Sequence, residues 1–224
     1  MSEPTPRGML IAIEGIDGAG KTTLANALVD TLQSFGQAAV YTKEPTHGQW
    51  GALLRASAHS ARLTLEEECD YLERDRREHV VGLIDPKLLA GAHVVLDRYY
   101  YSMAAYQGAA GADPAMILAR NMAFAPRPDI TFLLDLPVEV GLERIRRRGD
   151  VPNAFETNAT LEDCRAIFNS LQLPEIVRID ATASIERVHE IAMGHVLRAR
   201  AEWALAKDGF TPAAAERLLA FGGG

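Results

Sequence analysis

The sequence predicts an α/β protein in which a parallel sheet of five strands is flanked by helices in three layers. Short apolar runs alternate with longer segments of helical periodicity, which is typical of a parallel sheet that is buried on both faces. A glycine-rich turn joins the first apolar run to the first helical segment. The chain has 224 residues, 48% of them hydrophobic, so it can bury a sizeable core.

Five apolar runs are the expected strands, and four segments are the expected helices. The strands are predicted over residues 9–14, 38–42, 93–97, 129–135 and 175–180. The helices are predicted over residues 21–35, 50–60 and 64–90, and from about residue 184. Gly36 is a stop signal for the first helix, and Thr64 with Glu67 predicts a capping box at the start of the third.

The pattern indicates one domain over residues 1–224, because no repeat or low-complexity stretch interrupts the core region. Gly, Pro and Asn are frequent between Gly149 and Ala159. We therefore expect a mobile lid at about residues 146–159. A short C-terminal tail is expected at about residues 207–224, and nothing in it suggests chemistry.

Composition and charge disfavour several classes of function. The chain has a formal net charge of -7, which argues against a surface for duplex nucleic acid. Its two cysteines, Cys69 and Cys164, lack metal-ligand spacing and suit a reducing compartment. The first eight residues lack the apolar core of a signal peptide, and no apolar run has the length of a membrane span. We expect a cytoplasmic protein without nucleic-acid or membrane partners.

Residues 15–22 read G-I-D-G-A-G-K-T and fit the phosphate-binding pattern G-x-x-x-x-G-K-[ST] between a strand and a helix. Glycines let backbone N–H groups converge on phosphate oxygens, and the helix start adds positive potential. Lys21 can reach the β- and γ-phosphates, and Thr22 can complete a Mg²⁺ shell. We therefore predict ATP and Mg²⁺ as cofactors. The predicted ATP-binding residues are Gly15, Asp17, Gly18, Ala19, Gly20, Lys21, Thr22 and Thr23.

Six segments resemble the thymidylate kinase family in the same order along the chain. They are E-G-I-D-G-A-G-K-T-T at 14–23, K-E-P-T at 43–46, D-R at 75–76, D-R-Y with Ser102 and A-Y-Q-G at 97–108, R-I-R-R-R-G at 144–149, and I-D-A at 179–181. The segment 97–108 is the most specific, because many families share the phosphate-binding motif. The resemblance spans about residues 9–191. It implies a P-loop kinase fold and ATP-dependent phosphorylation of thymidylate (dTMP) to dTDP.

The resemblance also implies roles for residues near the acceptor phosphate. Asp17 would contact the 3′-hydroxyl of the acceptor sugar, a task that suits a carboxylate. Arg98 would make a forked contact with the acceptor α-phosphate, and Arg55 is a second candidate for phosphate binding. Asp97 would lie near Mg²⁺ or its waters, so Thr22 and Asp97 form the predicted metal site.

The base pocket follows the family less closely. Leu72 stands where the family has an aromatic residue that stacks on thymine, and Met103 stands where it has a small or polar side chain. Arg76 keeps its capacity to hydrogen-bond a pyrimidine carbonyl. Thymidylate is therefore the implied acceptor, with relaxed base specificity. The predicted acceptor site is Asp17, Arg55, Leu72, Arg76, Arg98, Ser102, Met103, Tyr106 and Gln107.

Four arginines, at positions 144, 146, 147 and 148, lie at the start of the predicted lid. Ala19 occupies a position where some family members carry a catalytic arginine, so the resemblance is to the subgroup whose catalytic arginine lies in the lid. Arginines that act this way contribute ~10³ to ~10⁵ in rate. Arg148, nearest the loop, is the first candidate. The predicted catalytic residues are Lys21, Asp17, Arg98, Arg146 and Arg148.

Other interpretations stay open at this point. An acidic turn residue at 17, a strand-end carboxylate at 97 and a basic helix end at 144–148 are common without any chemistry. The sequence has no N-K-x-D element, which disfavours a GTPase but leaves an ATPase open.

The motifs also fit another nucleoside monophosphate kinase, a deoxynucleoside kinase or an inert nucleotide-binding regulator. Arg98 and Arg55 favour a phosphorylated acceptor. A homodimer is implied by the resemblance only, and Val80, Leu83 and Leu88 could face either a core or a dimer interface.

Overall fold

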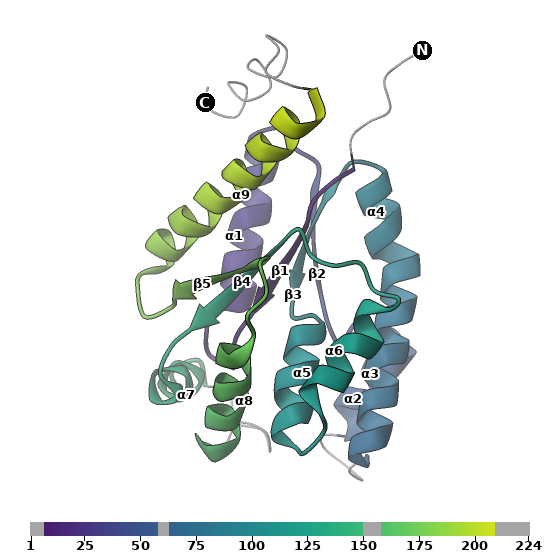
Figure 1. Cartoon of the computed structure of the whole chain (residues 1–224). Coiled ribbons are helices and arrows are strands. Elements are labelled where there is room, and N and C mark those ends of the chain that lie inside the picture. Colours follow the sequence, from purple (N-terminus) through teal and green to yellow (C-terminus); the bar gives the residue numbers. More distant parts are fainter. Residues whose placement is uncertain (1–6, 58–62, 150–157, 209–224) are drawn as a thin grey trace.

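A computed structural model describes residues 7–57, 63–149 and 158–208 (Figure 1). Its centre is a five-stranded sheet in which all neighbouring strands are parallel, in the order β2-β3-β1-β4-β5. The strands are β1 (Leu10–Glu14), β2 (Ala39–Lys43), β3 (His93–Asp97), β4 (Ile130–Asp135) and β5 (Ile176–Asp180). The predicted α/β class is confirmed, and every predicted strand ends within one residue of its observed bounds.

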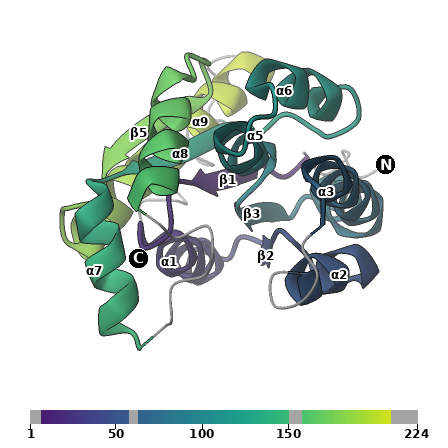
Figure 2. The same cartoon turned by 90° about the horizontal axis from the view of Figure 1, so that it is seen from below.

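Helices cover both faces of the sheet, as the three-layer prediction requires. Figure 2 shows α1 on one side of β1, and α5 with α8 on the other. The helices are α1 (Lys21–Ser34), α2 (Gln49–Ser57), α3 (Leu65–His79), α4 (Asp85–Leu89), α5 (Tyr100–Ala109), α6 (Pro114–Met122), α7 (Val138–Arg147), α8 (Asn158–Ser170) and α9 (Ile185–Asp208). Within the described ranges, no helix is both long enough and apolar enough to cross a membrane.

The two central strands bring distant segments to one edge of the sheet. Strands β1 and β3 are buried along their whole length. They pair in register, with Ile13 opposite Asp97. Because carboxyl ends of parallel strands lie at the same edge, the glycine-rich turn after Glu14 leaves the sheet beside the turn at Arg98. The fold thus places the phosphate-binding motif next to the segment 97–108.

The long helical segment predicted over residues 64–90 is present, but it is not uniform. It begins at the predicted capping box, in which Thr64 accepts from the Glu67 backbone and Glu67 accepts from the Thr64 backbone. A π-helical turn, η1 (Val80–Ile84), separates α3 from α4. Pro86 has no N–H to donate to the residue four positions earlier, so the hydrogen-bond pattern changes just before it.

The structure resolves which apolar residues of this segment face the core. Val80 and Leu88 are buried in the main core, and Leu83 packs against it. Val81 and Leu89 instead point outward, each with 74% of its surface exposed. The residues that we considered for a dimer interface are therefore core residues, and their neighbours form the exposed face.

Two glycines allow helix α7 to touch the glycine-rich turn directly. A Cβ atom at Gly141 would lie 2.6 Å from the carbonyl oxygen of Asp17. A Cβ atom at Gly18, whose φ is +81°, would lie 2.2 Å from the carbonyl oxygen of Gly141. Both separations are too short for real atoms, so only glycine fits at either position.

We predict that Gly141→Ala weakens ATP binding, because the added methyl group must push α7 away from the glycine-rich turn. Overpacking of this kind costs about 1–3 kcal/mol of stability. Since the shifted turn must return to its parental shape to bind ATP, the same energy opposes binding and corresponds to roughly a 5- to 150-fold loss of affinity at most. Gly194→Ala in α9 is the matched control, since no atom lies within 4 Å of its added Cβ. Calorimetric titration with ATP should separate the two variants. Parental affinity in Gly141→Ala would contradict the prediction.

Candidate active site

The glycine-rich turn forms a cradle at the start of α1. Gly20 is the N-cap of α1, and no side chain caps the helix there, so its first backbone N–H groups are open to an anion. The Nζ atom of Lys21 donates to the carbonyl oxygens of Gly15, at 3.0 Å, and Ile16, at 2.8 Å. It also lies 3.9 Å from the Asp17 carboxylate. The lysine is thus held beneath the turn where phosphates would bind.

Burial lowers the pKa of Lys21 to about 8, and the nearby Arg98 acts in the same direction. The carboxylates of Asp17, Asp97 and Glu14 oppose this shift. An ammonium group with few water contacts interacts strongly with an added anion, because the local dielectric constant is low. Bound phosphate oxygens would therefore stabilise the charged form of Lys21.

A cavity of about 300 Å³ adjoins the cradle. Three arginines at the C-terminal end of α7, two within the helix and Arg148 as its C-cap, line one part of it, and small or apolar side chains line another. The lining residues are Gly18, Ala19, Gly20, Thr23, Leu134, Arg144, Arg147, Arg148, Ala181, Ala183, Ile185 and Val188. Arginines suit the charged part of a nucleotide, and the apolar wall suits a base.

The sequence identified only part of this cavity. Arg148 lines it, and its charge contributes to lowering the pKa of Asp17. Arg146 is exposed and is not among the lining residues. Ala183, Ile185 and Val188 were missed. The position of β5 could have indicated them, because ligands of open α/β sheets bind at the carboxyl ends of the strands. Most of the predicted lid lies outside the described residues.

Thr22 and Asp97 meet beside the cradle as an oxygen-rich pair. The Thr22 hydroxyl donates to Oδ2 of Asp97 at 2.5 Å, and the Tyr41 hydroxyl lies 3.5 Å from the same oxygen. Oδ1 of Asp97 is buried and has no hydrogen-bond partner among the described residues. Hydroxyl and carboxylate oxygens are the ligand types that Mg²⁺ prefers, and a buried free oxygen is one that a cation could satisfy. These two residues therefore fit the predicted metal.

Arg98, Asp17 and Tyr106 converge from three segments. Arg98 has φ +68°, the only positive value of a non-glycine residue in the described ranges, and its N–H donates to Ile13 at 3.0 Å. Its guanidinium pairs with the Asp17 carboxylate and lies 5.0 Å from the centre of the Tyr106 ring. The Tyr106 hydroxyl donates to Asp17 at 2.9 Å.

Interactions between charges outweigh the effect of burial on the pKa values of Asp17 and Arg98. Burial alone would raise the pKa of Asp17, but Arg98 and then Lys21 hold it below its ordinary value. Burial alone would lower the pKa of Arg98, but Asp17 holds it above its ordinary range. Both side chains are therefore charged, and a second anion near Arg98 would compete with Asp17 for its donors.

Glu14 lies beneath this group, and sequence analysis, which named it as a strand end and as the first residue of the segment 14–23, gave it no role. It is fully buried, and its carboxylate accepts from the backbone N–H groups of Tyr99, at 2.8 Å, and Ser102, at 3.2 Å. The Ser102 hydroxyl also donates to it, and Nη1 of Arg98 lies 3.4 Å from that hydroxyl. Glu14 thus anchors the start of α5, and with it the residues that flank Arg98.

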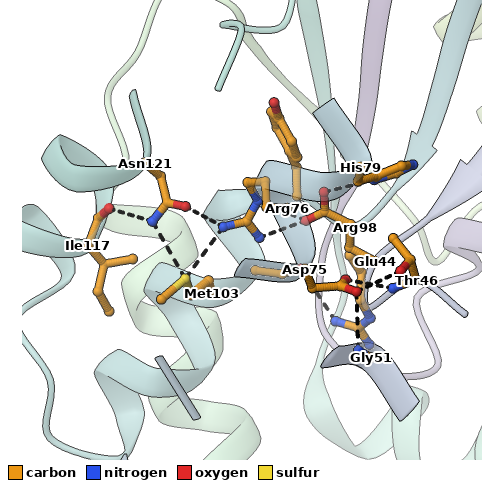
Figure 3. A network of polar contacts seen from close by, with 12 residues as sticks. Glu44, Thr46, Gly51, Asp75, Arg76, His79, Arg98, Met103, Ile117 and Asn121 are labelled. Atoms are coloured by element: carbon orange, nitrogen blue, oxygen red, sulfur yellow. Dashed lines mark hydrogen bonds and ion pairs between the residues drawn. The ribbon is translucent and has the colours of Figure 1, made fainter. Parts of the chain in front are cut away.

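The predicted base-pocket residues lie on α3 and α5. Leu72 packs on a small apolar cluster that includes Met103 and Ile117 and is separate from the main core. Arg76 is buried beside Met103 (Figure 3). Tyr71 does not take the place of the missing aromatic residue, because its ring pairs with Trp50 at 5.2 Å.

The two other residues predicted for the acceptor site are Arg55, on α2, and Gln107, on α5. Arg55 is exposed on α2 and donates to the carbonyl oxygens of Thr46, at 2.7 Å, and Pro45, at 3.3 Å. It therefore supports the loop after β2. Gln107 is buried on α5, directly after Tyr106.

The three consecutive tyrosines belong to the core. Tyr99, Tyr100 and Tyr101 are each at most 1% exposed. The Tyr99 hydroxyl donates to Pro126, and the Tyr101 hydroxyl donates to Glu175. All three tyrosines therefore pack in the core.

The parallel sheet, the strand–turn–helix cradle and the buried lysine together define a P-loop kinase fold. The family model described as Thymidylate kinase matches residues 13–191. The chain therefore belongs to the thymidylate kinase family, and the resemblance drawn from its motifs is confirmed.

Proteins named Thymidylate kinase match it over most of its length. One from Xanthomonas campestris pv. campestris (strain B100) is 56% identical over 200 residues, which cover 89% of this chain and 88% of that protein. One from Xylella fastidiosa (strain M12) is 56% identical over 192 residues, covering 86% and 88%. One from Xanthomonas euvesicatoria pv. vesicatoria (strain 85-10) is 52% identical over 222 residues, covering 99% and 97%.

We predict that Glu14 makes the protein less stable as the pH rises. Burial raises the pKa of Glu14 from 4.5 to about 7. Between these values the folded protein keeps a proton that the unfolded chain has released, so the free energy of unfolding falls with rising pH. Glu14→Gln cannot ionise, so its stability relative to the parent should increase between pH 5 and pH 8, by about 3 kcal/mol at most.

Urea unfolding at both pH values would measure this difference. Glu190→Gln is the control, because Glu190 is 70% exposed and pairs only at the surface with Arg187. A difference between Glu14→Gln and the parent that does not change with pH would contradict the prediction.

Proposed function

We propose that this chain transfers the γ-phosphoryl group of ATP to thymidylate and releases dTDP and ADP. The observation that carries the proposal is the convergence of Arg98, Asp17 and Tyr106 next to the P-loop. A cradle for a donor triphosphate and a separate arginine for an acceptor phosphate lie side by side there. The thymidylate kinases with which the chain shares more than half of its aligned residues support dTMP as the acceptor.

On the donor side, the P-loop amides and Lys21 would bind the β- and γ-phosphates of ATP. The arginines at the C-terminal end of α7 would face these phosphates across the cavity, and Arg148, the C-cap of the helix, is the favoured one to act on the transferring group. The wall formed by Ala181, Ala183 and Ile185 would hold the base. Thr22 and Asp97 would hold Mg²⁺, which neutralises charge on the phosphates when it is bound.

On the acceptor side, Arg98 would exchange its contact with Asp17 for a forked contact with the phosphate of dTMP. The freed Asp17 carboxylate, still bonded to Tyr106, can accept the 3′-hydroxyl of the sugar. Since Arg98 and Lys21 both contact Asp17, the two phosphates would be brought close together. Holding the reacting groups in place in this way supplies much of the rate of phosphoryl transfer.

The apolar base pocket supports a second candidate, the same reaction with relaxed pyrimidine specificity. Leu72 packs on the cluster that contains Met103, and the two would border the base without the aromatic ring or the small polar group of the family pattern. The coexistence of Lys21, Thr22, Asp97 and Arg98 in one site argues against an inert regulator.

We also propose a homodimer. The family resemblance suggests it, and Val81 and Leu89 are exposed apolar residues on the η1–α4 segment that could contribute to an interface. A cytoplasmic location suits Cys69 and Cys164, both of which are free thiols.

We predict that Arg98→Lys damages acceptor binding more than ATP binding. A lysine cannot reproduce a forked contact with phosphate, and losing one charge-assisted hydrogen bond costs about 1.5–3 kcal/mol. The KM for dTMP should therefore rise by roughly 10- to 150-fold, while the KM for ATP changes little. The exposed Arg187→Lys is the control. Equal losses for both substrates would show that Arg98 is structural.

An assay of ADP release across nucleoside monophosphates tests the function itself. We predict that dTMP is the best acceptor and that dUMP is also phosphorylated, because a methyl group in an apolar pocket contributes only about 1–3 kcal/mol. Leu72→Phe should tighten dTMP binding through ring stacking, by about 0.5–1.5 kcal/mol. Activity with none of the monophosphates would favour the inert regulator. A preference for dTMP over dUMP of many thousandfold would contradict our account of the pocket.

A further inference from the structure

The guanidinium of Arg76 is buried between two polar partners on different elements. Arg76 is 1% exposed. On one side, its Nε donates to Oε2 of Glu44 at 2.8 Å, and its Nη2 lies 2.7 Å from the same oxygen. The other carboxylate oxygen of Glu44 lies 3.0 Å from Nδ1 of His79. On the other side, Nη1 donates to Oδ1 of Asn121 at 2.5 Å (Figure 3).

Asn121 is fully buried on α6, and its amide can adopt only one orientation. Its Nδ2 donates to the carbonyl oxygen of Ile117 at 2.8 Å and lies 3.5 Å from Sδ of Met103. If the amide were reversed, its oxygen would face the Ile117 carbonyl and its NH₂ group would face the N–H groups of Arg76. Both contacts would be repulsive, so the acceptor oxygen must face the arginine.

The two partners together fix the plane of the guanidinium. A guanidinium has five N–H donors in a rigid fork. Glu44 holds the Nε edge, and Asn121 and the sulfur of Met103 take up Nη1. Among the described residues, Glu44 is the only acceptor that contacts Nη2, and one oxygen cannot satisfy both N–H groups of that atom well. Arg76 is almost completely covered in this structure, so its second Nη2 N–H would become a donor for a base only when one binds beside it.

This fixed group lies at the edge of the predicted base pocket. Leu72 is one turn before Arg76 on α3, so both side chains project from the same face of the helix. Met103 contacts Arg76 and also belongs to the apolar cluster against which Leu72 packs. The cluster would hold the ring of a base, and Arg76 is the charged group beside it.

We propose that Asn121 is a positioning residue for base selection. By fixing the plane of Arg76, it makes the pocket present an N–H donor to the group at C4 of a pyrimidine. Thymine and uracil carry a carbonyl acceptor there, whereas cytosine carries an amino donor. The inference rests on the proposed function and extends it.

Asn121→Leu tests the proposal, because leucine has a similar size but no acceptor. The protein would be assayed for dTMP phosphorylation with dCMP and dUMP as competing inhibitors. One N–H of Arg76 would lose its partner, an effect of about 1–3 kcal/mol, so discrimination between dTMP and dCMP should fall by roughly 5- to 150-fold. Discrimination between dTMP and dUMP should not change, since both carry the carbonyl. The KM for ATP should also stay at its parental value.

A double-mutant cycle with Arg76→Met shows whether Asn121 acts through Arg76. In the Arg76→Met background, Asn121→Leu should have no further effect on the dTMP to dCMP ratio. Asn121→Asp keeps an acceptor toward Arg76. Its discrimination between dTMP and dCMP should therefore be closer to that of the parent than the discrimination of Asn121→Leu is. Met122→Leu, at the next position of α6 and 36% exposed, is the control and should match the parent. If Asn121→Leu does not fold, Asn121→Ala allows the same comparison.

The outcomes separate this inference from the function on which it rests. Failure of the parent protein to phosphorylate dTMP would overturn the proposed function. A folded, active Asn121→Leu variant with the parental dTMP to dCMP ratio would overturn only the role of Asn121. An equal loss for all three monophosphates would also overturn it, because that result indicates a purely structural role.

Discussion

The ion pair between Arg98 and Asp17 is the interaction on which the rest of the site depends. Asp17 belongs to the loop after β1, and Arg98 belongs to the loop after β3. The two loops meet because β1 and β3 are neighbouring parallel strands whose ends are in register. Removing one partner of a largely buried pair leaves an uncompensated charge, so each loop constrains the position of the other. The pair therefore links the cradle that would bind ATP to the arginine that would bind the phosphate of the acceptor nucleotide.

The backbone around Arg98 shows how the fold maintains this arrangement. A positive φ is unfavourable for an arginine, by about 1 kcal/mol or more, and must be compensated by its surroundings. The N–H of Arg98 is bonded to Ile13, and the buried Glu14 anchors the backbone at Tyr99 and Ser102. Two successive residues of β1 thus hold the backbone on both sides of the arginine. Strand β1 therefore leads into the phosphate cradle and also fixes the position of Arg98, which would bind the acceptor phosphate.

The sequence predicts what depends on local patterns, and it misses what depends on packing. The strands were found within one residue because buried parallel strands are continuous apolar runs, and the capping box at Thr64 has a local signature. Asn121 could not be found, because it meets Arg76 across 45 positions of sequence and no spacing rule connects them. Glu14 resembled an ordinary strand end, although it is a buried anchor of α5. The apolar wall of the cavity follows from the place of β5 at one edge of the sheet.

The central claim is that this P-loop carries out phosphoryl transfer, and Lys21 tests it most directly. The measurement is the rate at which Lys21→Ala transfers labelled γ-phosphate from ATP to dTMP at saturating concentrations of both, with circular dichroism as the check on folding. Loss of a preorganised positive group at the transferring phosphate should lower the rate by about 10²-fold or more. A near-parental rate in a variant with an unchanged circular dichroism spectrum would contradict the account.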